Sequence, residues 1–507
     1  MLKVFNTLGN RIEPFEPLHP PRVGMYVCGV TVYNTVHVGH ARCYVSFDLI
    51  RRYLTYRGYD VTTAQNFTDI DDKIIDRAQR ENRDWRELTV FYTAEYFRMM
   101  DALGIRRADH YPRASEFIPR MLEIVETLVR KGHAYVTPSG DVYFEVATFP
   151  EYGALVAKSR LDSDTVSRVA SSDEKRSHND FALWKSAKPG EPSWDSPWGK
   201  GRPGWHIECS AMSGFYLGET FDIHGGGQDL IFPHHTNEIA QSQCFTGRPM
   251  ARYWMHNGFI NIDDEKMSKS LGNFITLEDA LPRWGAAALR MFFLRTHYRS
   301  PQNFDADMLN ESKAALGRLN EAVADAHVLL DNLPHSDCEP NKAGKKLAAS
   351  METAEGRFQE AMDDDFNSSA GLAVLFELAQ DVFGYVKTGA VPKAPGVNTQ
   401  LLADGVALLE KLLSVIGFYR GEVEYNHAAL ADALIAAGHD PLGADPLAFA
   451  LARRYSLRNT RDFAAADVVR DTIMKTTGLP VKDWPFGSTA SLQALVVEKI
   501  TPLEEKR

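Results

Sequence analysis

A histidine and a glutamate whose spacing suits metal binding stand in the segment "DLIFPHHTNEIAQ", which begins at Asp229. His234 and Glu238 are four positions apart, so they fall on one face of any helix that carries them. An imidazole and a carboxylate so placed supply half of a tetrahedral metal site. No Cys-x-x-Cys pair occurs in the chain to complete it. His235 is also within i, i+3 reach of Glu238, so spacing alone does not choose between the two histidines.

Two cysteines elsewhere in the chain are candidates for the missing ligands. Cys28 ends the predicted strand "RVGMYVCGVTVY", and Cys209 lies in "RPGWHIECSAMS". We expect three of the four candidate ligands to sit at the ends of strands of one sheet, where such ends converge. Two sulfurs, one nitrogen and one oxygen form a donor set that suits zinc. The alternative for each cysteine is ordinary packing in a core.

The segment "TVHVGHARC" indicates an anion site, because it lies where the first predicted strand feeds the first predicted helix. His37, Gly39 and His40 then lie at the carboxyl edge of the sheet, beside a helix N-terminus that favours anions. Two imidazoles there can donate hydrogen bonds to phosphate oxygens, and Gly39 allows a nucleotide to approach closely. The alternative is a helix-capping loop that holds histidines.

Two further segments carry groups that suit a nucleotide. In "DDEKMSKSLGN", Lys266 and Lys269 flank a serine-containing turn and can neutralise charge that develops on a departing pyrophosphate. In "HGGGQDL", Gly226 is one of three glycines that expose backbone N–H groups, and Asp229 can accept hydrogen bonds from ribose hydroxyls. The alternatives are a solvated charged face for the lysines and a tight structural turn for the glycines.

The elements that must position these residues read as a Rossmann-type α/β fold. The segments "RVGMYVCGVTVY", "HARCYVSFDLIRRYLTYRG" and "YDVTTAQNF" predict a strand, a helix and a strand, which make a right-handed parallel unit. A helical pattern follows from about residue 84 to 131. The apolar runs "FDIHGGG", "LIFPHH" and "YWMHNGFI" indicate a return to the same sheet. We therefore predict a catalytic domain in two halves, 1–110 and 200–260, around an inserted α/β connective segment, 111–199.

The second half of the chain is predominantly helical in its periodicity. Long helical patterns such as "NESKAALGRLNEAVADAHVLLDNL" continue without an intervening strand, which predicts an α-helical bundle over residues 311–425. Residues 261–310 form a linker domain that bears the K-M-S-K-S string. Residues 426–507 join a helix to the short β turn "LPVKDWPFGS" and predict a small C-terminal α+β domain.

Charge, cysteine content and the lengths of the apolar runs limit the classes of protein to which the chain can belong. The 507 residues carry a net charge of −11, which argues against a general polyanion binder but allows a local basic face. The five cysteines are scattered and odd in number, as is typical of a reducing compartment. The N-terminus has no signal-peptide core, and no run approaches the roughly 20 apolar residues of a membrane span. We expect a soluble cytoplasmic protein that binds no membrane.

Taken together, H-x-G-H and K-M-S-K-S resemble the two signature motifs of class I aminoacyl-tRNA synthetases, with the conservative Val38 where the family motif has isoleucine. The strings "VCGVTVYNTVHVGHAR", "RPGWHIECSAMS", "DIHGGGQDLIFPHHTNEIAQ", "KMSKSLGN" and "MDDDFN" are similar to the cysteinyl-tRNA synthetase family. The resemblance implies zinc ligands at Cys28, Cys209, His234 and Glu238. It implies a catalytic set of His37, His40, Lys266 and Lys269; an ATP-binding set of Gly39, Gly226, Asp229 and Lys269; and a substrate-binding set of Gly29, Thr31, Thr68, Trp205 and His224.

The resemblance also implies an activity and its partners. ATP would convert L-cysteine to cysteinyl-adenylate, and the 3′-terminal ribose of tRNA(Cys) would then accept the cysteine. One Zn²⁺ per chain and Mg²⁺ with ATP are the expected cofactors, and we expect a monomer. The bundle would hold the inner corner of the tRNA and the C-terminal domain its anticodon, with contacts from Asp483, Trp484 and Arg461. The alternative for Trp484 is a place in a small hydrophobic core.

A metal would explain how such an enzyme rejects serine. A free cysteine thiol has a pKa near 8.5, so zinc readily binds it as a thiolate. The serine hydroxyl is far harder to ionise and is a poor ligand for a soft metal. A hydrophobic pocket alone separates similar side chains by only about 1–3 kcal/mol. We therefore expect no separate editing site.

Two rival functions fit part of the pattern. One is a ligase that forms the same cysteine adenylate but transfers it to a small amine; such proteins lack the C-terminal extension that follows the bundle here. The other is a catalytically inactive RNA-binding paralogue with a structural zinc. The intact H-x-G-H and K-M-S-K-S motifs and the complete ligand set argue against such decay.

Overall fold

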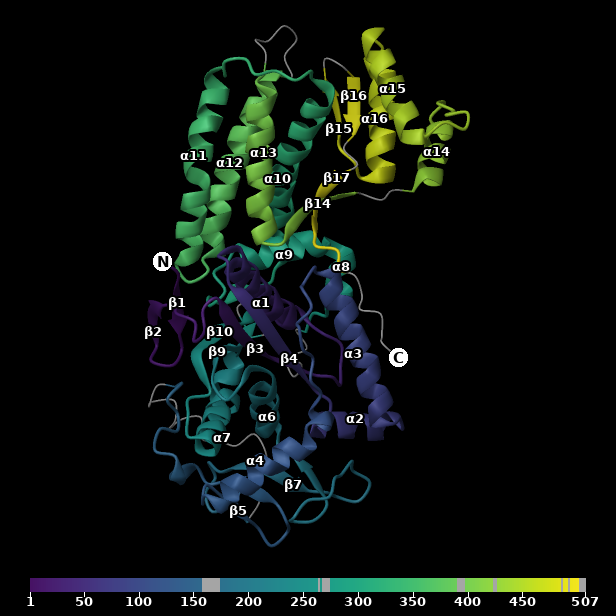
Figure 1. Ribbon diagram of the computed structural model, residues 1–507. Coiled ribbons are helices and arrows are strands. Elements are labelled where there is room, and N and C mark those ends of the chain that lie inside the picture. The colour runs from purple at the N-terminus through teal and green to yellow at the C-terminus, as the bar shows by residue number, and fades with distance from the viewer. Residues whose placement is uncertain are drawn as a thin grey trace. The chain divides into compact units, whose positions relative to one another are not determined.

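The computed structural model describes residues 1–156, 174–262, 265–266, 274–389, 397–422, 426–484, 487–490 and 493–500 (Figure 1). These residues form two compact units. Unit 1 holds Met1–Leu309 and Met362–Ser368, with the described residues from Lys499 on; unit 2 holds Asn310–Ala361 and Ser369–Glu498. The finer division into five parts remains a prediction.

The centre of unit 1 is a parallel sheet in the order β10-β9-β3-β4. Its strands are β3 (Arg22–Thr31), β4 (Asp60–Thr68), β9 (Phe221–Gly227) and β10 (Ala251–Asn257), and every neighbouring pair is parallel. The chain leaves β3 toward β4 on one side and β9 toward β10 on the other, so the connections diverge between β3 and β9. Ligands of open α/β sheets bind at such a switch point, beside the carboxyl ends of the strands. The predicted Rossmann-type catalytic fold is confirmed.

Helix α1 (Val38–Tyr56) connects β3 to β4 and packs against the sheet and against α9 (Ala286–Leu294). A buried charge network joins the two helices. Asp48 of α1 accepts from Arg52 Nε at 2.7 Å and from Arg290 of α9, and all three side chains are at most 1% exposed. Burial alone would raise the pKa of Asp48, but the two arginines outweigh burial and lower the pKa to about 2.

Replacing Asp48 with asparagine is expected to lower the free energy of unfolding by about 3–5 kcal/mol, because two buried guanidinium groups lose their counter-charge. The folded pKa of Asp48 lies below its unfolded value near 3.8, so the carboxylate stabilises the fold above that value and this stability is lost as pH falls toward 2. Denaturant unfolding from pH 5 to 2 measures both effects. The exposed Asp60→Asn serves as control, and an unchanged acid slope in Asp48→Asn contradicts the assignment.

The predicted helical pattern from 84 to 131 is two helices rather than one. Helix α3 (Trp85–Ala102) ends before Gly104, which has a φ of 64°, and α4 (Ile118–Arg130) begins after Pro112. Glycine in the left-handed region and proline both end a helix, so the apolar periodicity alone overstated its length. Helix α2 (Asp72–Glu81) precedes α3.

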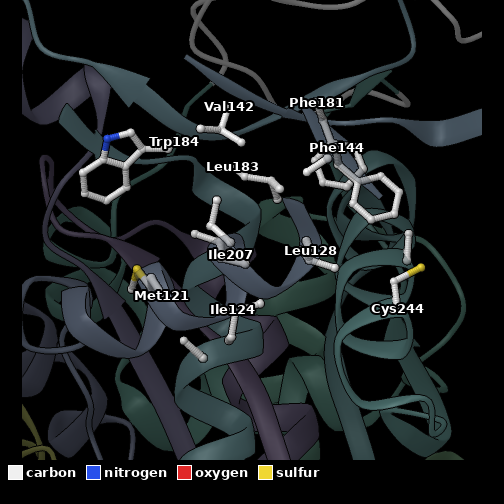
Figure 2. Close-up of a cluster of buried hydrophobic side chains, with 14 of the residues drawn as sticks. Met121, Ile124, Leu128, Val142, Phe144, Phe181, Leu183, Trp184, Ile207 and Cys244 are labelled. Atoms are coloured by element: carbon white, nitrogen blue, oxygen red, sulfur yellow. The ribbon is translucent and has the colours of Figure 1, made fainter. Parts of the chain in front are cut away.

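The inserted segment forms an antiparallel sheet of its own next to α4. The strand order is β5-β6-β7-β8, with bounds Ala134–Val136, Val142–Phe144, Phe181–Ser186 and Gly201–Pro203. Figure 2 shows α4 side chains facing this sheet, with Ile207 of α6 (Trp205–Leu217) and Cys244 of α7 (Thr236–Thr246) in the same cluster. Each fully buried apolar side chain contributes about 1.5–3 kcal/mol. The cluster thereby anchors the two helices that carry the candidate ligands Cys209 and Glu238.

The run "LIFPHH" was expected to be a strand, and this prediction is wrong. Residues Ile231–His235 form a π-type turn that is interrupted by extended backbone at Phe232 (φ −136°, ψ 129°) and leads directly into α7, after a short 3₁₀ turn at Gln228–Leu230. Pro233 has no N–H to give to a sheet, and the Phe232–Pro233 peptide is cis. An apolar run that contains proline is therefore poor evidence for a central strand.

Five short strands and one further α-helix are also described in unit 1. They are β1 (Lys3–Asn6), β2 (Arg11–Pro14), β11 (Ile260–Ile262), β12 (Glu265–Lys266), α8 (Leu277–Trp284) and β13 (Gln302–Asn303). Strand β11 pairs with β12 and with β13. Residues Met362–Ser368 return to unit 1, where Asp365 accepts hydrogen bonds from Phe5 N, Tyr298 and Arg299.

Unit 2 contains the predicted α-helical bundle. Its helices are α10 (Ala306–Asn332), α11 (Lys342–Asp363), α12 (Ser368–Gly389) and α13 (Thr399–Val415). By length and composition α12 could span a membrane, with a mean hydropathy of 1.2, contrary to the expectation that no run approaches a membrane span. Half of that apolar stretch is buried within the protein, including Leu375, Leu378 and Val382 at three- and four-residue spacing. That spacing is typical of a bundle core.

The C-terminal part of unit 2 is the expected small α+β region. Its helices are α14 (His427–Ala436), α15 (Pro446–Asn459) and α16 (Phe463–Thr477). Strand β14 (Phe418–Glu422) pairs with β17 (Gln493–Val497), and β15 (Val481–Trp484) pairs with β16 (Gly487–Ala490). A separate apolar cluster, which includes Leu430, Ala450 and Val469, holds the three helices together.

Candidate metal centre and active site

Cys28, Cys209, His234 and Glu238 converge in unit 1, with one ligand atom from each within 4.8 Å of all the others. The two sulfurs are 3.7 Å apart, and Cys209 Sγ lies 3.7 Å from His234 Nε2. Two sulfurs bound at about 2.3 Å to a tetrahedral zinc ion lie about 3.8 Å apart. All four residues are buried. The donor types and their separations therefore fit a metal ion.

The expectation that three of these ligands sit at strand ends is wrong. Only Cys28 lies in a strand, β3, at an irregularity in its pairing with β4. Cys209 lies in α6, His234 in the π-type turn and Glu238 in α7. Helices that pack on the sheet bring side chains to its edge just as strands do. A prediction made from the strand ends alone therefore misses these helical positions.

The pKa values of the two thiols shift in opposite directions. Burial raises the pKa of Cys28 well above its usual value. The hydrogen bond from Cys28 lowers the pKa of Cys209 to about 6, against an opposing effect of burial. Cys209 is therefore the first of the pair to become a thiolate, the form that binds metal.

Glu238 is held between two histidines. Its Oε1 lies 2.9 Å from His234 Nε2 and its Oε2 lies 2.6 Å from His224 Nε2. Burial would raise the pKa of Glu238, but these neighbours lower it well below the usual range. Burial would likewise lower the pKa of His234, but Glu238 and Cys209 raise it to about 10. Glu238 is thus held ionised although it is buried away from solvent. A buried cation-binding site needs such a carboxylate.

His235 belongs to a second group of possible ligands, with Cys28, His224 and Glu238. His235 Nε2 lies 3.3 Å from Cys28 Sγ, and its Nδ1 lies 2.8 Å from His256 Nε2. The two groups share Cys28 and Glu238, so they describe one centre. They differ in whether His234 or His235 would be a ligand. The His234 group contains both thiols, and soft thiolates favour zinc over harder ions.

His206 and Trp205 fix the orientation of the His234 ring. His206 Nδ1 lies 2.8 Å from His234 Nδ1, and Trp205 stacks on His234 with ring centroids 4.2 Å apart. With Nδ1 engaged by His206, Nε2 is the nitrogen that faces Cys209 and Glu238. Outer hydrogen bonds of this kind set the tautomer of metal-binding histidines. Trp205 is 39% exposed, so part of its side chain remains accessible.

Gly29, Thr31 and Thr68 lie beside the metal cluster at the ends of β3 and β4. Gly29 N donates to Asn66 Oδ1 at 2.8 Å, and Cys209 Sγ lies 3.8 Å from the same oxygen. A Cβ on Gly29 would lie 1.6 Å from the Asn66 carbonyl oxygen. Only glycine therefore permits this approach of the two strands.

The H-x-G-H segment caps a helix, which is one of the two readings considered for it, and its role toward phosphate remains a prediction. His37 is the N-cap of α1, and its Nδ1 accepts from Gly39 N at 3.1 Å and from His40 N at 3.3 Å. His40 Nδ1 in turn faces the His37 N–H at 3.4 Å. A neutral imidazole that accepts at Nδ1 carries its proton on Nε2. The stacked rings, 3.6 Å apart, are thus two Nε2–H donors.

The segment before α1 is also hydrogen-bonded to the chain that follows the K-M-S-K-S string. Val38 N donates to Ile275 O at 3.1 Å, and Leu277 N donates to Val36 O at 3.0 Å. Lys266 is placed by its backbone in β12, opposite Asn261 of β11, while Lys269 lies outside the described residues. The residues that follow the K-M-S-K-S string and the histidine segment are therefore joined by backbone hydrogen bonds.

Gly226, Asp229 and His224 surround the carboxyl end of β9. A Cβ on Gly226 would lie 2.9 Å from Leu230 Cδ1, which is a packing reason for glycine there. Asp229 follows in the 3₁₀ turn. The His224 ring is fully buried, stacks on Trp254 and contacts Glu238, so it supports one of the four candidate ligands.

The three predicted tRNA contacts lie in unit 2. Asp483 forms a bidentate pair with the buried Arg454, at 3.0 and 2.6 Å, and accepts from Ser488 at 2.7 Å. Trp484 is only 8% exposed and donates from Nε1 to Thr489, as expected for a small core. Arg461 is exposed at the turn between α15 and α16.

Sequence reasoning missed Asn66, His206 and Glu208. Glu208 is fully buried, and its Oε2 accepts from the Thr68 hydroxyl at 2.7 Å. Burial raises the pKa of the Glu208 carboxyl well above its usual value. An acidic residue next to Cys209 in the apolar context "HIECSAM" was the available signal, because such a position is expected to be buried.

Comparisons with known proteins agree with this architecture. The family described as "tRNA synthetases class I (C) catalytic domain" matches residues 14–314, and the "DALR domain" family matches residues 357–420. The cysteine--tRNA ligase of Thermodesulfovibrio yellowstonii is 44% identical over 492 residues, which cover 96% of this chain and 98% of that one. The cysteine--tRNA ligase of Geobacter metallireducens is 45% identical over 488 residues, 96% and 99% of the two chains.

Solved structures show the same fold at lower identity. Methionyl-tRNA synthetase of Mycobacterium tuberculosis bound by methionyl-adenylate superposes with a TM-score of 0.61 at 16% identity. The superposition covers 84% of this chain and 95% of that one. At this identity the likeness establishes the fold alone.

Proposed function

Because the chain belongs to the cysteine--tRNA ligase family of class I aminoacyl-tRNA synthetases, we propose that it activates L-cysteine with ATP and transfers it to the 3′-terminal ribose of tRNA(Cys). Cysteine, ATP and tRNA are its partners, and translation is the process that it serves. The convergence of Cys28, Cys209, His234 and Glu238 beside Thr68 and Trp205 is the observation that carries the proposal. We place the protein in the cytoplasm as a monomer.

We assign Zn²⁺ to the cluster. A bound zinc ion would supply a Lewis acid that favours the thiolate over the alcohol side chain, and thus cysteine over serine. The protein's own contribution is to keep the four donors buried and oriented. His206 fixes the His234 tautomer, and His224 holds the Glu238 carboxylate.

The first step is attack by the cysteine carboxylate on the α-phosphate of ATP. A carboxylate is already ionised at neutral pH, so the step needs no general base. Catalysis then consists of positioning and of stabilising charge on the phosphates. His37 and His40 offer paired Nε2–H donors to the reacting phosphate, and the N-terminus of α1 adds its partial positive charge. Magnesium with ATP is the second cofactor that we propose.

Pyrophosphate leaves as the adenylate forms, and we assign Lys266 and Lys269 to it. Gly39, Gly226 and Asp229 are the proposed ATP contacts. In the second step a terminal ribose hydroxyl of the tRNA attacks the adenylate carbonyl, and AMP departs. We propose that the bundle holds the inner corner of the tRNA and that the C-terminal region contacts the anticodon, with Arg461 the exposed candidate cation.

One pair of assays separates this function from its rivals. We expect cysteine-dependent ATP–pyrophosphate exchange, and charging of tRNA(Cys) with cysteine. Exchange without charging would favour the ligase that acts on a small amine. Loss of both activities would favour the inactive RNA-binding paralogue.

Replacing Lys269 with alanine is expected to slow exchange by about 10²-fold, because one charge that stabilises the transition state is removed. Cysteine binding and metal content should remain at wild-type levels. Steady-state exchange kinetics and metal analysis measure the effects, with Lys131→Ala as a lysine control in unit 1 whose side chain binds the α7 carbonyls. Near-wild-type exchange in Lys269→Ala would refute the assigned role.

A further inference from the structure

Two buried neighbours, Glu208 and Asn66, form hydrogen bonds with the Thr68 hydroxyl. Thr68 Oγ1 donates to Glu208 Oε2 at 2.7 Å, and Asn66 Nδ2 lies 3.4 Å from Thr68 Oγ1 as a donor. A hydroxyl carries one proton and two acceptor lone pairs. The proton and one lone pair are thus engaged within the protein. What remains at Thr68 is one lone pair, which can only accept.

Glu208 is a costly residue to place where it lies. It sits in α6 with no exposed area, and its Oε1 has no hydrogen-bond partner among the described residues. Burying a carboxyl group with one oxygen unsatisfied costs stability, and an apolar side chain would fill the same space without that cost. A buried polar group of this kind calls for a functional explanation.

The Thr68–Glu208 pair lies next to the position proposed for the substrate thiol. Glu208 directly precedes Cys209 in α6, and Asn66, which contacts Thr68, also contacts Cys209 Sγ at 3.8 Å. In cysteine only two carbon atoms separate the sulfur from the nitrogen. A cysteine whose sulfur lies at the metal cluster therefore places its ammonium or its carboxylate within reach of this pair.

Resting on the function proposed above, we propose that Glu208 is a positioning residue that orients the bound cysteine through Thr68. By accepting the hydrogen bond that the Thr68 hydroxyl donates, Glu208 leaves Thr68 an obligatory hydrogen-bond acceptor toward any further ligand. An ammonium group is a donor only and matches that acceptor, whereas a carboxylate is an acceptor only and is rejected. The carboxylate of cysteine is thereby directed away from Thr68 and toward ATP.

The test compares two ligands in zinc-loaded protein: L-cysteine and 3-mercaptopropionate, which has the thiol and carboxylate but no amino group. Glu208→Met removes the acceptor at similar side-chain size. It should weaken cysteine binding about 10- to 100-fold by isothermal titration, the range expected when a buried hydrogen bond to a charged group is lost. Binding of 3-mercaptopropionate should change less than about threefold, and the KM for ATP should stay unchanged.

Matched variants keep the result interpretable. Glu208→Gln retains an oxygen that can accept from Thr68 and should preserve most of the cysteine affinity. Thr68→Val removes the acceptor without altering Glu208, so it should reproduce the selective loss even if Glu208→Met folds poorly. The double variant should lose little more than either single one, because both act on one interaction. Ser213→Ala, a buried hydroxyl of the same helix, should leave both affinities unchanged.

Two outcomes would overturn the proposal. Equal weakening of both ligands in Glu208→Met and Thr68→Val would reveal a structural role only. Unchanged cysteine affinity in both variants would reveal no role. If the wild-type protein neither binds cysteine nor supports cysteine-dependent exchange, the proposed function itself fails, and this result is distinct from both.

Discussion

A Cys209→Ser variant is expected to lose its bound metal and at least about 10³-fold in kcat/KM for cysteine activation. Cys209 is the thiol whose pKa the site lowers, and it contacts Cys28, His234 and Asn66 at 3.7–3.8 Å. A serine hydroxyl remains protonated and is a poor ligand for a soft metal. Without the metal, the site keeps no group that distinguishes a thiol from an alcohol.

Metal analysis of purified protein, competition with a chelator, and cysteine-dependent exchange together measure this loss. The matched control is Cys244→Ser. Cys244 is also buried in unit 1 and lies in α7, the helix that carries Glu238, but it belongs to the apolar cluster instead. It should retain one metal ion per chain. Stoichiometric, equally tight zinc binding by Cys209→Ser would contradict the ligand assignment.

A Gly29→Ala variant is expected to reduce cysteine activation by on the order of 10³-fold. The added methyl group would lie 1.6 Å from the Asn66 carbonyl oxygen, and ordinary contact begins near 3.4 Å, so β3 and β4 must separate by about 2 Å here. Misplacement of reacting groups by about 1 Å can cost about 10²-fold in rate. The displacement reaches Cys28, the preceding residue, and Thr68, two residues beyond Asn66.

Exchange kinetics and thermal unfolding of the same preparation separate the local effect from general unfolding. Gly214→Ala is the matched control, because a Cβ there meets nothing within 4 Å and the residue lies in helix α6. Alanine is the better helix former by about 0.5–1 kcal/mol, so this control should be as stable as wild type or more so. If Gly29→Ala is as active as the control, the close strand approach has no part in activity.

The sequence predicted the parallel core of unit 1 well, because its signals are local. A buried strand, an amphipathic helix and a second strand follow each other within about 40 residues, and each has the hydrophobic period of its type. The positions of Cys28 in β3 and of His37 at the start of α1 followed from that pattern. The helical bundle was predicted in the same way, from long stretches of helical periodicity with no strand between them.

The assembly of the ligand set could not be derived from periodicity. Which histidine faces the two thiols depends on a helical turn at Pro233, and that turn has the apolar composition of a strand. The role of Glu208 depends on the meeting of α6 with the end of β4, which no local pattern encodes. Family resemblance supplied the ligand identities because it records the outcome of such long-range packing.

The Cys28–Glu238 contact joins residues that are 210 positions apart, on the first and last of the segments that build the metal cluster. During synthesis on the ribosome, therefore, the first thiol is complete long before its partners exist. The centre can form only after the inserted segment and both helices that carry the other donors have emerged. On the zinc assignment proposed above, metal capture is consequently a late event in the life of each molecule, and a tightly held ion would report that unit 1 has finished folding.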